Sequence, residues 1–126
     1  MNTFLPPDGS AAATPVHLDT ELALSQIGDL DAVRSMLAML DETLTRDVAQ
    51  VAALLAQGDT AAANVILHPL KGFLPIFCRP ALCHAVETVE GLTRQADAQA
   101  ARLAYAELAP ALQQLQAEVI HYLHGH

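Results

Sequence analysis

Two long runs of apolar residues, spaced three and four positions apart, constrain the fold of this 126-residue chain more than any other feature. An α-helix has 3.6 residues per turn, so this spacing puts the apolar residues on one stripe of a helix, which must be buried against a partner. The first run is Val33, Met36, Leu37, Leu40, Leu44, Val48, Val51 and Leu55, and the second is Tyr105, Leu108, Leu112, Leu115, Val119 and Tyr122.

Helix-capping residues indicate where these and the remaining helices begin and end. Asp19 or Thr20 can cap a short helix that Gly28 ends, and Asp29 or Asp31 can start the first long helix. The turn Gln57-Gly58-Asp59 ends that helix, and the further predicted helices run from Thr60 to about Phe77, from Ala81 to about Gln95 and from Ala98 to about Leu123.

Four long amphipathic helices joined by short loops predict an all-α fold, an antiparallel four-helix bundle with a short additional N-terminal helix. The 24 alanines and 20 leucines agree with this, because both residues favour helices. Residues 1–17, with three prolines and a glycine, are predicted to form a flexible or loosely docked tail, and residues 18–126 the bundle domain. Pro110 is expected on the solvent side of the last helix.

Composition excludes several classes of function. A net charge of −8 argues against nucleic-acid binding, which depends on Lys and Arg. The chain has no run of eighteen apolar residues and no signal-peptide pattern, so we expect a cytoplasmic protein without a membrane span. We also expect a monomer. Cys78 and Cys83 are interpreted as small buried hydrophobic residues rather than metal ligands, because a zinc site needs a second pair of ligands.

One helix carries an unusual outer face. At 100° per residue, the side of the helix opposite its apolar stripe carries Asn64, His68, Lys71, Gly72 and Pro75. A histidine that faces water and is partly uncharged at neutral pH can act as a phosphoryl nucleophile. Lys71 would offset the phosphoryl charge, and Gly72 would let a donor approach closely. The alternative is an exposed histidine with no chemical role.

The segment His68-Pro69-Leu70-Lys71-Gly72 resembles the H-x-L-K-G motif of histidine-containing phosphotransfer domains of two-component phosphorelays. The preceding residues 54–59, and the spacing of Leu82, Val86 and Glu90 in the following helix, are similar to that family as well. The resemblance implies that His68 accepts a phosphoryl group from the phospho-aspartate of a receiver domain, and that a second receiver removes it. It implies no kinase activity, and no cofactor on this chain, because the Mg²⁺ belongs to the receiver.

The same resemblance implies response-regulator receiver domains or a hybrid sensor kinase, in a bacterial signalling pathway, as partners. It also suggests that a polar residue on the next helix orients the imidazole. Asn64, Glu90 and Arg94 are therefore supporting candidates. We expect Glu90 and Arg94 on the face opposite Leu82, Val86 and Val89, where the alternative is a solvated pair four residues apart.

The chain also departs from the family pattern. Pro69 and Pro75 predict a kink, or a helix that ends early near Phe73 or Leu74, because a proline removes a helix hydrogen bond. The bulky residues after Gly72 are expected to be mostly core, although Phe73 or Pro75 could extend an apolar docking patch. They also leave open an alternative function, a helical scaffold that binds receiver or kinase domains without phosphoryl transfer.

Overall fold

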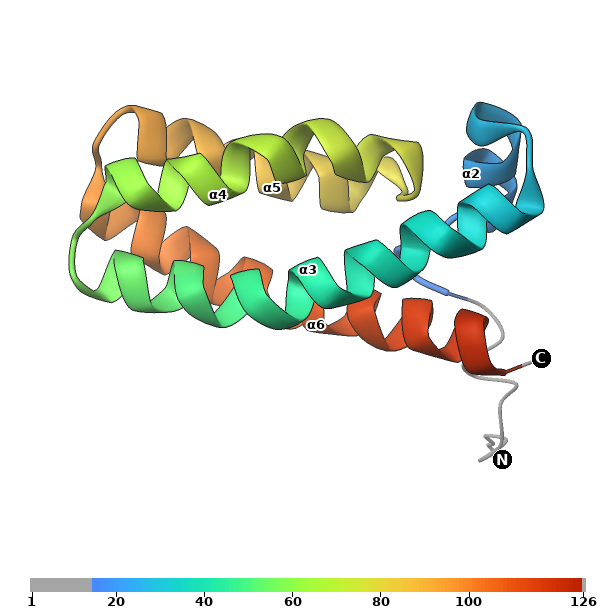
Figure 1. Ribbon diagram of the computed structural model, residues 1–126. Coiled ribbons are helices and arrows are strands. Elements are labelled where there is room, and N and C mark those ends of the chain that lie inside the picture. The colour runs from blue at the N-terminus through green and yellow to red at the C-terminus, as the bar shows by residue number, and fades with distance from the viewer. Residues whose placement is uncertain (1–14, 126) are drawn as a thin grey trace, which may run out of the picture.

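The computed structural model describes residues 15–125, and within them every α-helix except α5 (Pro80–Arg94) begins after an aspartate cap (Figure 1). Asp19, Asp29, Asp59 and Asp97 each accept a hydrogen bond from the backbone N–H three residues later. Asp19 rather than Thr20, and Asp29 rather than Asp31, are therefore the caps. The helices are α2 (Thr20–Ile27), α3 (Leu30–Ala56), α4 (Thr60–Phe73), α5 (Pro80–Arg94) and α6 (Ala98–His124), with a 3₁₀ turn, η1 (Leu74–Ile76).

The end of α4 differs from the predicted boundary near Phe77. The α-helix stops at Phe73 and continues only as the 3₁₀ turn η1. Pro75 has no N–H to donate to the carbonyl of Lys71, and the N–H of Phe77 donates to the carbonyl of Leu74, three residues back, as in a 3₁₀ turn. The early end expected near Phe73 or Leu74 is thus confirmed, and α4 passes through Pro69 as one helix.

The last two helices start and end close to the predicted positions. Helix α5 begins at Pro80, one residue before the predicted start, because the first position of a helix needs no N–H donor. Pro110 is exposed on α6, as expected, and the helix runs through it to His124.

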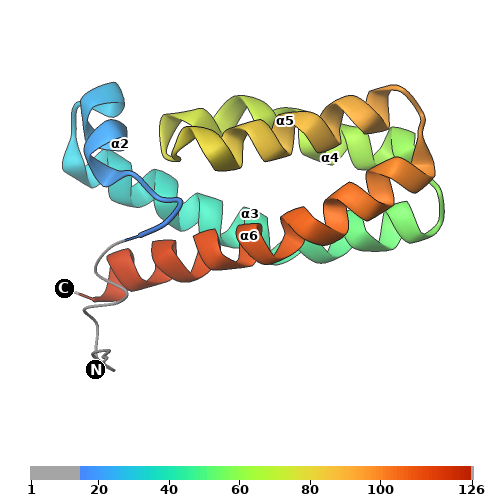
Figure 2. The same cartoon turned by 180° about the vertical axis from the view of Figure 1, so that it is seen from behind.

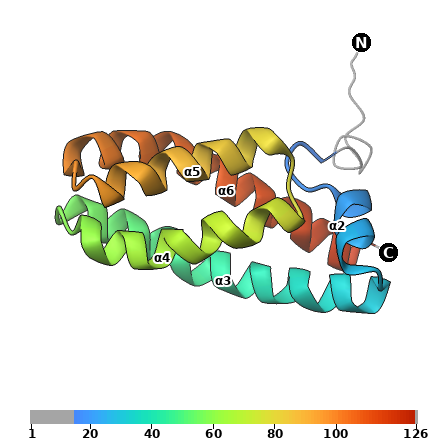
Figure 3. The ribbon, with the colours of Figure 1, turned by 90° about the horizontal axis from the view of Figure 1, so that it is seen from above.

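The helices form a bundle of two packed pairs, in which α3 lies against α6 and α4 against α5. The pair α4–α5 forms one layer and the pair α3–α6 the other (Figures 1 and 3). Helices α3 and α6 have 27 residues each, about 40 Å, whereas α4 and α5 have 14 and 15. The long pair therefore extends beyond the short pair at one end, and α2 packs there against α3 and η1.

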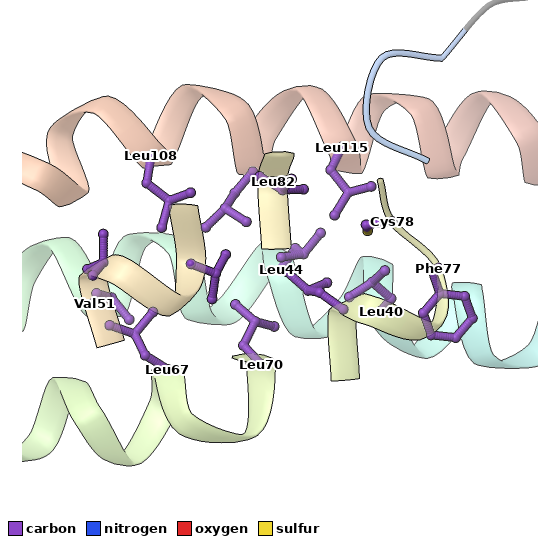
Figure 4. Packing of buried hydrophobic residues seen from close by; sticks show 14 of the residues in the cluster. Leu40, Leu44, Val51, Leu67, Leu70, Phe77, Cys78, Leu82, Leu108 and Leu115 are labelled. Carbon is purple, nitrogen blue, oxygen red and sulfur yellow. The ribbon is translucent and has the colours of Figure 1, made fainter. Parts of the chain in front are cut away.

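The core consists of the predicted apolar stripes, and α3, α4, α5 and α6 all contribute to it (Figure 4). Leucines meet there from α3 (Leu40, Leu44), α4 (Leu67, Leu70), α5 (Leu82) and α6 (Leu108, Leu115). Phe77 and Cys78 close the core beyond η1, and both are buried. The interpretation of Cys78 as a buried hydrophobic residue is confirmed. Cys83 is partly exposed, and both thiols are free.

The segment just before α2, residues 16–18, is hydrogen-bonded to the carboxylate of Glu118 on α6. Glu118 accepts hydrogen bonds from the backbone N–H groups of Val16, His17 and Leu18, at 2.8, 2.9 and 2.9 Å. Figure 2 shows this segment running between α2 and the C-terminal half of α6. Leu18 is buried and forms a single antiparallel bridge with Cys78. The docked part of the chain thus begins before residue 18, and residues 1–14 of the predicted tail lie outside the described residues.

Candidate functional site

His68 lies on the outer face of α4, as its place in the helical pattern predicts. Its side chain is 65% exposed. The neighbours Leu67 and Leu70 are buried and hold the opposite side of the helix in the core. The position of the histidine is therefore fixed by the packing of α4, while its ring reaches water.

The imidazole is hydrogen-bonded to the fully buried side chain of Glu90 on α5. Glu90 Oε2 lies 3.2 Å from His68 Nδ1 and accepts a hydrogen bond from Asn64 Nδ2 at 2.9 Å. Glu90 Oε1 accepts one from Lys71 Nζ at 3.2 Å. The Nε of Arg94 lies 3.1 Å from both carboxylate oxygens. One carboxylate therefore contacts all the other polar residues that the sequence singled out on α4 and α5, namely Asn64, His68, Lys71 and Arg94.

The predicted placement of Glu90 was wrong. It is not on a solvated face opposite Leu82, Val86 and Val89 but buried beside them. Four residues after Val86, Glu90 is only about 40° away around the helix axis, on the same side. The i, i+4 pair with Arg94 does exist, but only the arginine is exposed. Helical spacing alone therefore places Glu90 on the same side of α5 as the apolar stripe.

The charge of Glu90 follows from its partners. Burial alone would raise the pKa of the carboxyl group, but hydrogen bonds from Asn64, His68, Lys71 and Arg94 outweigh it and lower the pKa to about 2. Glu90 is therefore ionised at neutral pH and can only accept hydrogen bonds, so His68 Nδ1 must carry the proton. In this tautomer the ring lone pair is on Nε2, the other ring nitrogen.

Asn64 has a structural part in this site. Its Nδ2 group also lies 3.0 Å from Thr93 Oγ1 on α5. The Thr93 hydroxyl in turn donates to the backbone carbonyl of Glu90 at 2.6 Å. These contacts tie α4 to α5 beneath the imidazole. Sequence reasoning missed Thr93, which is buried. The available signal was its spacing, because a polar residue seven positions after Val86 falls on the apolar stripe of α5.

The two remaining site residues on α4, Lys71 and Gly72, differ in their contacts with the rest of the chain. Lys71, the only lysine in the chain, is mostly covered and is positioned by Glu90. Gly72 is exposed, and a Cβ atom added to it would meet nothing within 4 Å. The packing of the chain itself therefore does not require glycine at this position, although a glycine inside a helix costs about 1 kcal/mol relative to alanine.

The described residues hold no group of three or more His, Cys, Asp or Glu side chains that could bind a metal ion. In the same part of the chain, no helix combines the length and apolar character needed to cross a membrane. Comparisons with protein-family models, curated proteins and solved structures gave no match for this chain.

Proposed function

We propose that the chain is a histidine phosphotransfer protein, in which His68 accepts a phosphoryl group from a receiver-domain aspartate and passes it to another receiver. The observation that carries this proposal is the exposed imidazole of His68 with Nδ1 bound to a buried, ionised carboxylate. That arrangement leaves Nε2 as an outward nucleophile in a fixed orientation. The similarity of residues 68–72 to the phosphotransfer motif supports the same role.

The transfer can be written with these atoms. Nε2 of His68 attacks the phosphorus of the phospho-aspartate, the N–P bond forms, the P–O bond to the aspartate breaks, and the aspartate leaves as a carboxylate. The imidazole gains a positive charge in this step while Nδ1 keeps its proton. The negative charge of Glu90, 3.2 Å from Nδ1, stabilises that developing charge. Transfer to the second receiver is the reverse reaction with a different aspartate.

Two cations stand beside the nucleophile. Lys71 and Arg94 contact the same carboxylate as His68, so together with Glu90 they leave one net positive charge near the imidazole. A phosphoryl group on Nε2 would be attracted by this charge. The magnesium ion that the phosphotransfer family relies on would be bound by the receiver. This chain contributes the nucleophile, its orientation and the surrounding charge.

The open space over Gly72 would allow a partner protein to approach the backbone of α4. The chain gains nothing internally from this glycine, whereas a surface that brings a phospho-aspartate to His68 must approach the backbone of α4 closely. Response-regulator receiver domains, or the receiver of a hybrid sensor kinase, are the proposed partners. The alternative, a scaffold that binds such domains without transfer, would not need an oriented imidazole.

A phosphotransfer assay tests the proposal. Each receiver domain encoded in the same genome is phosphorylated with radiolabelled acetyl phosphate and mixed with the protein. We expect label on this chain that is labile in acid and stable in alkali. His68→Gln should abolish it with an unchanged circular-dichroism spectrum, because the side chain is exposed.

The matched control is His84→Gln. His84 is an exposed histidine on α5 outside the site, so its replacement should leave labelling intact. Label that persists in His68→Gln would contradict the proposal. Receiver binding without any labelling, unaffected by His68→Gln, would favour the scaffold.

A further inference from the structure

The carboxylate of Glu90 has two kinds of hydrogen-bond donor. Lys71 and Arg94 are long, charged side chains, and Arg94 is 59% exposed. Such side chains lose much rotamer freedom when they are held in one position, and water screens their charges. Asn64, by contrast, is neutral and short. Of the donors other than His68, whose ring is itself to be oriented, Asn64 is therefore the best suited to fix the carboxylate.

Asn64 is in turn held by Thr93, which is buried on α5. The ionised carboxylate of Glu90 only accepts hydrogen bonds, so the Nδ2 group of Asn64, and not its oxygen, must face it. One Nδ2 proton is directed to Glu90 Oε2 at 2.9 Å and the other to Thr93 Oγ1 at 3.0 Å. The backbone carbonyl of Glu90 is a more distant acceptor, at 3.4 Å. Both protons of the amide are thus used, and they define one orientation of Asn64.

The hydroxyl of Thr93 is fixed by the helix that carries Glu90. It donates its proton to the backbone carbonyl of Glu90, three residues earlier, at 2.6 Å, and so presents a lone pair to Asn64. A chain of hydrogen bonds therefore connects the backbone of α5, Thr93, Asn64 and the carboxylate of Glu90. Hydrogen bonds in such a buried chain strengthen one another.

We infer that Thr93 is a positioning residue for phosphoryl transfer, and that it acts through Asn64 on the carboxylate of Glu90. This inference rests on the proposed phosphotransfer function. Held in this way, Glu90 Oε2 keeps the ring proton of His68 on Nδ1. Without the Thr93 hydroxyl the amide of Asn64 can turn, and the carboxylate can rotate with Arg94, which contacts both of its oxygens.

The consequence for the reaction follows from the two tautomers of imidazole. The proton of a neutral ring that is not held by an acceptor can occupy either nitrogen. Only rings with the proton on Nδ1 have a free lone pair on Nε2 and can attack the phosphorus. A loosened Glu90 should therefore lower the maximal rate of transfer by His68, without changing how a receiver binds.

The tautomer of the His68 ring tests the inference without any receiver. Thr93→Val keeps the shape of the side chain and removes the hydroxyl. In ¹⁵N NMR spectra of the neutral ring, we expect the proton on Nδ1 in the wild type and a mixture of both tautomers in Thr93→Val. Thr93→Ser keeps a hydroxyl and should keep the wild-type spectrum. The matched control is Thr88→Val, because Thr88 also donates to a backbone carbonyl of α5 but lies outside the site.

Transfer kinetics separate positioning from docking. Thr93 is only 3% exposed and cannot contact a receiver. Thr93→Val should therefore lower the maximal transfer rate about three- to tenfold, the equivalent of one hydrogen bond, and leave the half-maximal receiver concentration unchanged. Thr88→Val should change neither quantity, and Thr93→Ser should transfer at close to the wild-type rate.

Asn64→Leu tests the same contact from α4, at a partly exposed position where folding is less sensitive than at the buried Thr93. Because both residues act through one hydrogen-bond chain, the double variant should be no slower than Asn64→Leu alone. A proton that stays on Nδ1 in both Thr93→Val and Asn64→Leu would overturn the inference and leave the phosphotransfer function standing. Failure of every receiver to label the wild-type protein would overturn that function, and with it the role of Thr93 in transfer, whatever the tautomer.

Discussion

Replacing the buried acid by its amide, Glu90→Gln, removes the charge beneath His68 and keeps the size of the side chain. The wild-type carboxyl group has a pKa of about 2, against an ordinary value of 4.5. A difference of this size corresponds to about 3 kcal/mol of stabilisation of the folded state at pH 7. Because His68 and Arg94 reach water, which screens their charges, we expect the variant to lose about 1 to 3 kcal/mol of unfolding free energy.

The pH dependence gives this prediction its sign. The pKa of Glu90 is lower in the folded protein, so its contribution is complete above about pH 5 and is lost as the pH falls towards 2. Urea unfolding followed by circular dichroism should therefore show a gap between wild type and Glu90→Gln that closes from pH 7 to pH 2. Glu118, whose pKa is also lowered, titrates in both proteins and cancels in the difference.

A second measurement separates stability from chemistry. The amide oxygen of glutamine can still accept the Nδ1–H of His68, so the ring orientation is kept while the charge is lost. We expect phosphoryl transfer to slow roughly five- to tenfold in Glu90→Gln, and further in Glu90→Ala, which also loses the hydrogen bond. Equal stability of wild type and Glu90→Gln at pH 7, or a gap independent of pH, would refute the reasoning.

Four further substitutions have defined outcomes. Gly72→Ala and Gly91→Ala should each stabilise a helix by up to about 1 kcal/mol in thermal unfolding, but only Gly72→Ala should slow transfer, because only Gly72 lies beside the nucleophile. Lys71→Ala should keep the fold and slow transfer or shorten the lifetime of the phosphohistidine, and unchanged kinetics would remove Lys71 from the site. Glu118→Gln should release residues 16–18 from α6. Hydrogen exchange would detect this as faster exchange of the buried Leu18 amide, and unaltered protection of that amide would contradict the prediction.

Much of the fold was predictable because its signals are local. The apolar stripes of α3 and α6, and the caps Asp19, Asp29 and Asp59, depend on residues a few positions apart. The outward direction of His68 followed from the same 3.6-residue period. The end of α4 was less certain, since Pro69 and Pro75 both remove a helix hydrogen bond, and only Pro75 ends the helix.

The contacts between distant residues were not predictable in this way. Asn64 on α4 contacts Thr93 on α5, and the segment before α2 contacts Glu118 on α6, so neither contact follows from the spacing within one helix. The attachment of residues 16–18 to Glu118 joins positions about one hundred residues apart in the sequence. No periodic pattern reports such a pairing, because it depends on where the chain returns after four helices.

The sequence by itself determined an all-α bundle with one histidine facing water, with a lysine and a glycine beside it. Only the tertiary structure decided that a buried carboxylate lies against that histidine. His68 and Glu90 are 22 residues apart, and the distance between their side chains depends on how α4 and α5 pack and in which register. Helical periodicity orients a side chain about its own axis, whereas the packing of two helices determines which side chains meet.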